Sequence, residues 1–331
     1  MTEAVTRNQG DADNAEKLRR LHDAQRALLP QEILQALIDP DVTDIDLNSD
    51  GKVWLNTHSH GRKQLLLQYP INPQSISAFL GQVAGYYTQQ LDFNNPFLSA
   101  VLPLDSSRLE AAVPPAVDAP QFEIRKKPSI VYTLDDYVAS NIMTSEQADA
   151  VRAAVLRRSN ILVSGGTGSG KTTLANAILH EIVASTPIGT RFLVLEDLAE
   201  LQCTAANKQS VRTVEPDHNL TVLLKRTLRK DPDRVIIGEV RGPEAYDLHK
   251  ALNTGHPGGL ATIHANDARA ALQRFDDLIQ EAGVPSQARQ IANSAITVVH
   301  IEGKGSSRRV REVATVTGLN SDGTYAVNRL A

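Results

Sequence analysis

Short apolar runs alternate with helical patterns along the second half of the chain. The apolar runs lie at residues 161–163, 192–195, 235–237 and 260–263. The stretches with helical spacing lie at residues 171–184, 219–230 and 243–253. Continuous apolar runs are typical of strands buried on both faces, and strands that alternate with helices form parallel sheets. The pattern predicts an α/β domain with a parallel sheet over residues 141–331.

The first half of the chain has a mixed pattern. Residues 44–48 alternate polar and apolar positions, the turn-forming residues 49–52 follow, and an apolar run resumes at 53–55, which predicts a β-hairpin. Helical patterns at 30–38 and 75–87 and strand patterns at 108–113 and 122–125 complete the segment. We therefore expect a smaller mixed α/β domain over residues 29–130 and a helix over 145–157. Linker-like sequence begins near residue 126, and we place the linker between the domains at residues 131–140.

The first 28 residues are mostly polar. Residues 1–15 contain a glycine and several aspartates and asparagines, and they are predicted to be disordered. Leu18, Leu21 and Leu28 have near-helical spacing, which predicts a helix over residues 16–28. We expect this helix to pack on a neighbouring element, and a helix that lies on a membrane surface is the alternative.

Composition places the protein among soluble globular chains. The 331 residues are 41% hydrophobic and 22% charged, and the net charge is −4. No overall basic field attracts nucleic acid, so sequence-specific nucleic-acid binding is not expected. Cys203 is the single cysteine, which excludes a disulfide framework and a cysteine-based zinc site. No apolar run approaches the roughly 18 residues of a membrane span, and no signal peptide is visible. We expect a cytoplasmic protein whose membrane contact is at most peripheral, at the inner face.

The most informative motif lies between the first apolar run and the helix that follows it. Residues 165–173 fit the phosphate-binding pattern G-x-x-x-x-G-K-[ST] in a strand–loop–helix context. Its glycines let backbone N–H groups turn toward an anion, and the helix directs its positive end to the same point. The predicted nucleotide-binding residues of this P-loop are Gly165, Gly166, Thr167, Gly168, Ser169, Gly170, Lys171, Thr172 and Thr173.

Two side chains of the P-loop have predicted roles of their own. Lys171 would reach the β- and γ-phosphates, and Thr172 would bind Mg²⁺. The expected substrate is ATP and the expected cofactor is Mg²⁺. A GTPase would need a guanine-reading N-K-x-D, and the nearest string, at residues 207–210, lacks its carboxylate.

Polar side chains follow the other three apolar runs directly. Glu196, Glu239 and His264 each come at or just after the end of a predicted parallel strand. The carboxyl ends of parallel strands meet at one edge of the sheet, which is where α/β sheets bind ligands. We therefore expect all three residues to converge with the P-loop on one nucleotide.

Hydrolysis of a phosphoanhydride needs a held metal, an oriented water and cations that meet the developing charge. We expect Glu196 to orient or deprotonate the attacking water, with Glu200 as a supporting carboxylate. Glu239 would hold Mg²⁺ through water, and His264 would sense the γ-phosphate or the shell of the metal. His256 either joins His264 or lines a loop, and the residues alone leave both possibilities open.

Three further segments resemble those of the secretion ATPases of type II and type IV systems. They are an acidic segment over residues 191–201, a second one over residues 228–242 and a histidine-containing segment over residues 253–266. The segment 39–48 also resembles the opening hairpin of that family. Within the family, the length and the amino-terminal half are most similar to the conjugal-transfer ATPases.

The resemblance implies a RecA-like P-loop domain, a ring of six identical subunits and action on components of a membrane-embedded secretion or conjugation apparatus. Family members carry arginines of the amino-terminal domain that reach phosphate, and Arg108 and Arg125 occupy the matching places. The resemblance also makes Arg229 and Arg241 candidates for bridging subunits or supporting Glu239.

Other readings stay open at this point. The four-cysteine zinc insertion of type II secretion ATPases is absent, since Cys203 stands alone. A type IV pilus extension or retraction motor shares every motif. A nucleic-acid-stimulated translocase would need basic loops, for which Lys225, Arg226 and the cluster at 308–311 are candidates. A scaffold that uses ATP only for assembly is disfavoured by the complete set of Lys171, Glu196 and Glu239.

Overall fold

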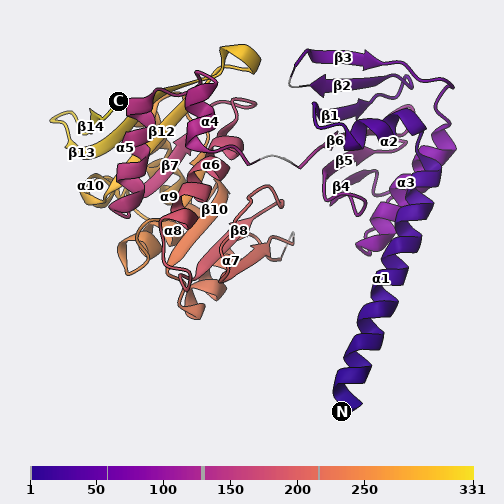
Figure 1. Ribbon diagram of the computed structural model, residues 1–331, viewed down its shortest axis with the longest axis horizontal. Helices are drawn as coiled ribbons and strands as arrows, with labels where there is room; N and C mark the ends of the chain where they lie inside the picture. The colour runs from indigo at the N-terminus through magenta and orange to yellow at the C-terminus, as the bar shows by residue number, and fades with distance from the viewer. Residues whose placement is uncertain (1, 58, 128–130, 215–216) are drawn as a thin grey trace. The chain divides into compact units, whose positions relative to one another are not determined.

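The computed structural model describes residues 2–57, 59–127, 131–214 and 217–331. The chain divides into two compact units, Met1–Ser129 and Ile130–Ala331 (Figure 1). Each is described below by itself. Residues 128–130, which belong to the linker region expected to begin near residue 126, lie outside the described residues.

The amino-terminal unit contains an antiparallel sheet with the strand order β3-β2-β1-β6-β5-β4. Its strands are β1 (Val42–Leu47), β2 (Val53–Thr57), β3 (Gly61–Leu65), β4 (Phe97–Val101), β5 (Arg108–Ala112) and β6 (Gln121–Arg125). The predicted hairpin is confirmed, because β1 pairs antiparallel with β2. Gly51 closes its turn with a φ of 79° and donates its N–H to the Asn48 carbonyl at 3.0 Å.

Helices α1 (Thr2–Leu28), α2 (Gln31–Ile38) and α3 (Pro73–Tyr86) accompany this sheet. Buried side chains of α2 and α3, such as Ile33 and Phe79, form one apolar core with Ile45, Leu109 and Ile124 of the sheet. Strands β1, β2 and β6 alternate buried positions with more accessible ones, so one face of the sheet supplies the core.

The prediction of a disordered start over residues 1–15 is wrong for the described part, because a continuous helix begins at Thr2. Proline is absent from residues 2–28, so no residue lacks the N–H that an α-helix requires. Glu16 accepts hydrogen bonds from Arg19 and Arg20 at 2.9 Å, a spacing that supports a helix. The end of α1 contacts α3 and buries Gln25 completely, as expected for a helix that packs on a neighbour.

The carboxy-terminal unit contains a sheet with the strand order β14-β13-β12-β7-β11-β10-β8-β9. Its strands are β7 (Asn160–Ser164), β8 (Phe192–Glu196), β9 (Lys208–Arg212), β10 (Arg234–Val240), β11 (Leu260–Ile263), β12 (Ile296–Glu302), β13 (Arg309–Leu319) and β14 (Tyr325–Arg329). The strands from β12 to β9 in this order are parallel, while β13 and β14 are antiparallel at one edge. The predicted parallel sheet is confirmed.

Helices cover both faces of this sheet (Figure 1). They are α4 (Leu134–Ala139), α5 (Ser145–Leu156), α6 (Lys171–Ala184), α7 (Leu220–Thr227), α8 (Glu244–Asn253), α9 (Ala268–Gln280) and α10 (Ala288–Asn293), with 3₁₀ turns at Leu228–Lys230 and Gly305–Ser307. Within β7, Ile161 and Val163 pack toward α4, α5 and α6, while Leu162 packs toward α7 to α10. Burial on both faces explains the continuous apolar run that marks this strand in the sequence.

The prediction of a linker over residues 131–140 is wrong. Most of this segment forms helix α4, which begins with a capping box in which Thr133 and Asp136 exchange hydrogen bonds. Leu134 and Tyr137 are 1% and 4% exposed and belong to the core of the carboxy-terminal unit. This segment belongs to the carboxy-terminal unit because Leu134 and Tyr137 are buried in the core of that unit and Val138 packs against it.

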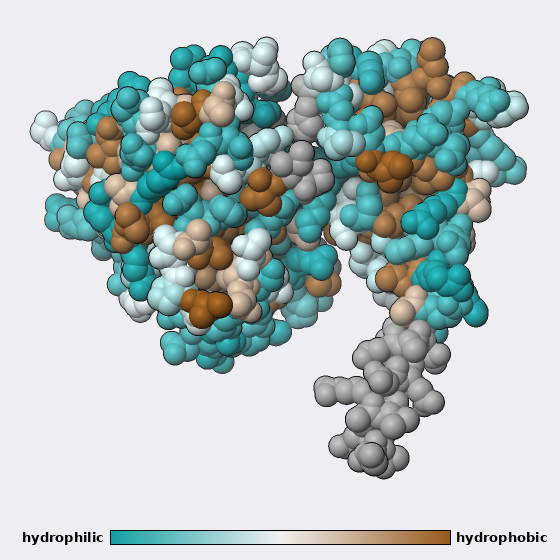
Figure 2. All heavy atoms as spheres, in the orientation of Figure 1, coloured by the Kyte–Doolittle hydropathy of each residue, from teal (hydrophilic) through white to brown (hydrophobic). Residues whose placement is uncertain are grey.

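Hydrophilic residues cover most of the face of each unit that Figure 2 shows, and hydrophobic residues form small separate groups on it. Among the described residues, no helix combines the length and the apolar character needed to cross a membrane.

Candidate nucleotide site

The loop between β7 and α6 has the backbone of a phosphate cradle. Gly168 and Gly170 adopt φ values of 75° and 93°, a region that glycine enters without steric cost. Gly170 is the N-cap of α6 and offers no side-chain hydrogen bond to the first turn of the helix. The N–H groups of a first helical turn need acceptors from outside the helix, so this terminus suits an anion.

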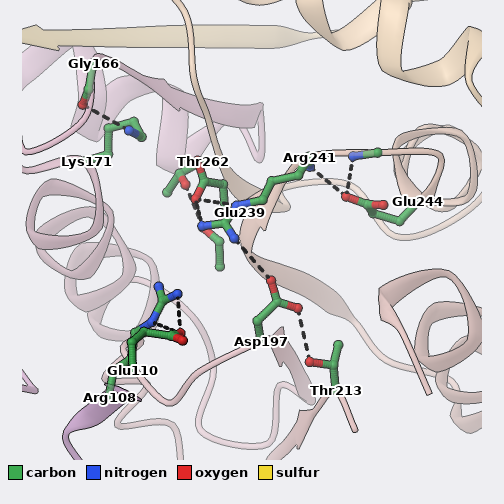
Figure 3. Close-up of polar contacts among 12 residues, drawn as sticks. Arg108, Glu110, Gly166, Lys171, Asp197, Thr213, Glu239, Arg241, Glu244 and Thr262 are labelled. Atoms are coloured by element: carbon green, nitrogen blue, oxygen red, sulfur yellow. Dashed lines mark hydrogen bonds and ion pairs between the residues drawn. The ribbon is translucent and has the colours of Figure 1, made fainter. Parts of the chain in front are cut away.

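Two side chains of the loop converge on the Gly166 carbonyl oxygen. Lys171 Nζ donates to it at 3.1 Å, as Figure 3 shows, and Ser169 Oγ donates to it at 2.8 Å. Gly165 permits no side chain, since a Cβ there would lie 2.3 Å from the carbonyl oxygen of Ile301 in β12. The loop is therefore held closely against β12 while the lysine ammonium lies across it.

Glu196 ends β8 and is 4% exposed. Its Oε2 accepts hydrogen bonds from the backbone N–H groups of Glu200 and Leu201, both at 2.9 Å. These two bonds fix the orientation of the carboxylate and the turn that carries Glu200. The side chain of Asn176, in α6, binds the same turn through the Glu200 carbonyl at 3.0 Å and the N–H of Gln202 at 2.8 Å. No local sequence pattern indicates this role for Asn176.

Glu239 lies within β10, next to the strand end, and forms an ion pair with Arg241. Arg241 donates to Glu239 Oε2 from Nε at 2.9 Å and from Nη2 at 2.5 Å. Its Nη1 lies 3.8 Å from Asp197 Oδ2, so the guanidinium lies between two acidic side chains (Figure 3). Of the two roles predicted for Arg241, contact with Glu239 is the one that this subunit displays.

Glu244 and Thr262 stabilise this part of the sheet through hydrogen bonds. Neither residue was predicted to belong to the site. Glu244 is 7% exposed, and its Oε1 accepts the N–H groups of Arg241 at 2.7 Å and Gly242 at 2.9 Å. Thr262 Oγ1, on β11, donates to the Gly238 carbonyl of β10 at 2.7 Å. A signal for Glu244 exists in the sequence, because an acidic residue in the first turn of a predicted helix commonly accepts nearby N–H groups.

The structure separates the two histidines of the third motif. His264 directly follows β11 and is exposed. His256 precedes β11, and its Nδ1 donates to the Pro232 carbonyl at 2.6 Å, just before β10 begins. The four-residue strand β11 lies between them, which places them about 13 Å apart or more along the strand direction. The structure therefore supports the prediction that His256 lines a loop, and not the prediction that it joins His264.

Arg229 also lies at the amino-terminal edge of the sheet, in the 3₁₀ turn Leu228–Lys230 before β10. Glu239 lies five residue steps along β10 from its first residue, Arg234, a span of about 16 Å. Within this subunit Glu239 pairs with Arg241, and both predicted roles of Arg229 stay predictions.

Arg108 and Arg125 are neighbours on adjacent strands of the amino-terminal unit. They are direct partners in the antiparallel register of β5 and β6. Arg108 donates to Glu110 Oε1 from Nη2 at 2.8 Å and from Nε at 3.0 Å, and Figure 3 shows this pair. Two like charges in directly opposed positions repel, and Glu110 offsets part of that repulsion. The two guanidinium groups therefore lie on adjacent strands, and one of them is bound to Glu110.

A buried hydroxyl–imidazole pair lies immediately before the P-loop. Ser164 Oγ, at the end of β7, lies 2.9 Å from His300 Nδ1 on β12, and both residues are buried. Burial lowers the pKa of His300, which opposes the raising effect of the carboxylates of Glu312 and Glu302. The neutral imidazole thus links the end of β7 to β12. The burial of His300 could have been predicted from the apolar run that contains it. Its contact with Ser164 could not have been predicted.

The described residues contain no group of three or more His, Cys, Asp or Glu that could hold a metal ion. Cys203 is a buried free thiol, and burial raises its pKa. The donors at the sheet edge are instead a hydroxyl, Thr172, and a carboxylate, Glu239. Hard oxygen donors of this kind are the ligands that Mg²⁺ prefers when phosphate oxygens complete its shell.

Comparison with known proteins gives three findings. Residues 98–307 match the family described as Type II/IV secretion system protein. The chain is 42% identical over 305 residues to Conjugal transfer protein TrbB from Rhizobium radiobacter, which covers 92% of each chain. It is 32% identical over 240 residues to Type IV secretion system protein VirB11 from Bartonella henselae, which covers 60% of this chain and 66% of that one.

Among solved structures, the pilus retraction motor PilT with bound ADP matches with a TM-score of 0.65 at 20% identity. The match covers 89% of this chain and 84% of PilT. Because the identity is only 20%, this match shows a similarity of fold and nothing more.

Proposed function

The chain belongs to the Type II/IV secretion system protein family, and we propose that it is an ATPase that powers conjugal transfer through a type IV secretion apparatus. Its reaction is the hydrolysis of ATP to ADP and phosphate. The observation that carries this proposal is the shared edge of the parallel sheet: β7, β8, β10 and β11 end there with the P-loop, Glu196, Glu239 and His264.

The P-loop residues would hold the phosphates of ATP. The open first turn of α6 accepts the anion, and Lys171 exchanges its contact with the Gly166 carbonyl for the β- and γ-phosphate oxygens. Thr172 and, through water, Glu239 would hold Mg²⁺, which neutralises phosphate charge when it is bound. The uncapped helix terminus and the oxygen donors fit this pair of ligands.

Glu196 is the proposed carboxylate for the attacking water. Its Oε2 is fixed by two backbone N–H groups, and an orientation fixed in advance is what a water-orienting group needs. The water oxygen forms a bond to the γ-phosphorus and passes a proton to the Glu196 carboxylate, the bond to the bridging oxygen breaks, and ADP carries that electron pair away. Glu200 is the proposed supporting carboxylate for the water, and its backbone N–H donates to Glu196 Oε2. His264 lies at the same edge to sense the γ-phosphate.

We further propose that the chain has a RecA-like P-loop domain and works as a cytoplasmic ring of six copies, docked on the membrane-embedded apparatus. Arg108 and Arg125 would bring the positive charge of the amino-terminal unit to nucleotide phosphate. The support is their direct cross-strand pairing, which concentrates two guanidinium groups at one place. Arg229, exposed at the other edge of the sheet, is the candidate for contact between subunits.

The alternative functions have less support. The likeness to a pilus motor is one of fold, whereas the relatives of high identity are named for conjugal transfer and type IV secretion. Two of the basic residues that a nucleic-acid translocase would use, Lys225 and Arg311, have local acidic partners. Lys225 Nζ lies 3.5 Å from Asp247 Oδ2, and Arg311 is paired with Glu302.

The test is phosphate release by the purified full-length protein with ATP and Mg²⁺. We expect steady turnover that falls at least about a hundredfold in Lys171→Ala, because the variant removes the charge next to the β- and γ-phosphates. Mass measurement with an ATP analogue and Mg²⁺ tests the ring, and a monomer under all conditions would contradict it. Strong, salt-sensitive stimulation by single-stranded DNA would instead favour the translocase.

A further inference from the structure

The segment that follows β12 lies against the P-loop. Strand β12 pairs in parallel with β7, with His300 opposite Ser164, so both strands end at the same edge of the sheet. The P-loop begins after Ser164, and residues 303–308 begin after Glu302. Two segments separated by more than a hundred residues of sequence therefore leave adjacent strands side by side.

Two cationic side chains of this segment contact the P-loop glycines. A Cβ placed on Gly168 would lie 3.3 Å from Lys304 Cε and 3.8 Å from its Nζ. A Cβ placed on Gly170 would lie 3.0 Å from Arg308 Nε and 3.2 Å from its Cζ. The absence of side chains at these two glycines is thus what lets an ammonium and a guanidinium approach the backbone of the cradle.

Arg308 carries a buried polar group without a partner. Its Nε has no hydrogen-bond acceptor within the described part of the chain, although the atom is buried. A buried charged donor without an acceptor is unfavourable, and an anion in the adjacent cradle is the natural acceptor. The segment itself is locally fixed, because Ser307 Oγ accepts the Lys304 N–H at 3.1 Å and donates to the Lys304 carbonyl at 2.8 Å.

The order of the strands shows which part of a nucleotide these cations face. Glu196, Glu239 and His264 belong to strands on the β11 side of β7, whereas Lys304 and Arg308 follow β12 on the opposite side. A nucleotide whose γ-phosphate points to the acidic residues would direct its sugar, and the phosphates next to it, toward β12.

We infer that Lys304 and Arg308 bind the sugar-proximal phosphates of a nucleoside diphosphate or triphosphate, and so determine nucleotide affinity and not the rate of cleavage. This inference rests on the proposed function. The neighbouring arginines are occupied elsewhere: Arg309 Nη1 donates to the Ser306 carbonyl at 2.9 Å and to the Arg308 carbonyl at 2.6 Å, and Arg311 is paired with Glu302.

The test compares Lys304→Ala and Arg308→Ala with Arg309→Ala as a matched control, in the full-length protein. Kd values for ADP and ATP are measured by displacement of a fluorescent nucleotide, and kcat at saturating ATP by phosphate release. We expect each variant to weaken ADP and ATP binding by the same factor, about tenfold, because each removes a charge-assisted contact that both nucleotides share. The kcat should stay within about twofold, Arg308→Lys should restore part of the affinity, and Arg309→Ala should change neither value.

Two outcomes would overturn the inference. Unchanged Kd values for both nucleotides in Lys304→Ala, whose exposed side chain is the safer one to remove, would exclude contact with the phosphates. A loss of affinity confined to ATP would place the cations at the γ-phosphate instead. If the wild-type protein bound neither nucleotide, the proposed function would fail as well. If the wild type hydrolysed ATP and the variants lost no affinity, this inference alone would fail.

Discussion

Arg241 neutralises Glu239 through two hydrogen bonds to a single carboxylate oxygen, from Nε at 2.9 Å and from Nη2 at 2.5 Å. Burial works against the charge of the guanidinium, but the bond to Glu239 and the nearby acidic groups outweigh it and raise the pKa of Arg241. The guanidinium therefore stays charged, and its two hydrogen bonds hold Glu239 at the strand end in one orientation. A metal-binding role for Glu239 must share this carboxylate with Arg241.

Glu239→Gln should lower kcat at least about a hundredfold while the Kd for ATP changes by less than about threefold. The amide keeps the size of the side chain but loses the charge that would hold the waters of Mg²⁺. Steady-state phosphate release and equilibrium nucleotide binding measure the two effects. An unchanged rate would defeat the assignment of Glu239.

Arg241→Ala should lower kcat less than Glu239→Gln does, because it removes only the group that orients the carboxylate. The double variant should be no slower than Glu239→Gln alone, since a positioning residue has nothing left to position. Strictly additive losses would show that Arg241 acts on the reaction independently of Glu239.

Glu196→Gln should lower the free energy of unfolding by about 1–3 kcal/mol and also lower kcat. The neutral amide accepts the N–H groups of Glu200 and Leu201 more weakly than the carboxylate does. Chemical denaturation measures the stability, and phosphate release measures the rate. Loss of stability with an unchanged rate would leave Glu196 a purely structural residue of the turn.

Gly258→Ala should destabilise the protein by about 2–4 kcal/mol. Gly258 has a φ of 81°, and a Cβ on it would lie 2.2 Å from Arg234 Nη1 and 3.3 Å from Arg158 Cα. Arg234 is 2% exposed and donates to the Gly258 carbonyl at 2.8 Å, and burial lowers its pKa to about 10. The side chain therefore has little freedom to move away.

The matched control is Gly189→Ala, where a Cβ would meet nothing within 4 Å. Thermal unfolding of the two variants should differ clearly, with Gly189→Ala close to the wild type. Equal stability of both variants would show that the turn around Gly258 adapts without cost.

Lowering the pH from about 7 toward 5 should reduce stability, and His300 should account for part of the slope. Its folded-state pKa is below the value of 6.5, so the unfolded chain takes up a proton in a range where the folded protein does not. Stability therefore rises with pH through that range, by at most about 1.4 kcal/mol per pH unit for one histidine.

Denaturation of wild-type protein and His300→Gln at several pH values checks this expectation. The variant should show a shallower slope, even if its stability at neutral pH is lower because the contact to Ser164 changes. His249, whose pKa burial also lowers, should contribute a separate share that His249→Gln removes. An identical slope in His300→Gln would contradict the burial of a neutral imidazole.

The parallel strands could be predicted because a strand that is buried on both faces needs a continuous run of apolar residues. Ile161, Leu162 and Val163 must all be apolar when both faces of the strand are covered. Strand β3, by contrast, has mostly exposed polar side chains, and its pairing with β2 defines it. Helix α4 was not predicted because it is only six residues long and has two buried side chains, Leu134 and Tyr137, too few to give a clear helical pattern.

The motifs predicted the acidic residues of the site. The contacts around these residues could not be predicted, because they join segments that are distant in the sequence. Spacing alone places Glu239 near the strand end, yet no local pattern shows that Arg241 binds it. Likewise, the sequence does not show that His256 lies at the far end of β11 from His264. The approach of Lys304 and Arg308 to Gly168 and Gly170 depends on the pairing of β12 with β7.

The pairing of β12 with β7 has a consequence for truncated forms of the protein. Without residues from Ile296 onward, the N–H and C=O groups of Asn160–Ser164 that now bind β12 would have no partner, and β7 would become an edge strand. Exposed apolar edges invite pairing with other chains. A fragment that keeps every recognisable motif up to His264 would therefore be expected to aggregate instead of presenting a working P-loop.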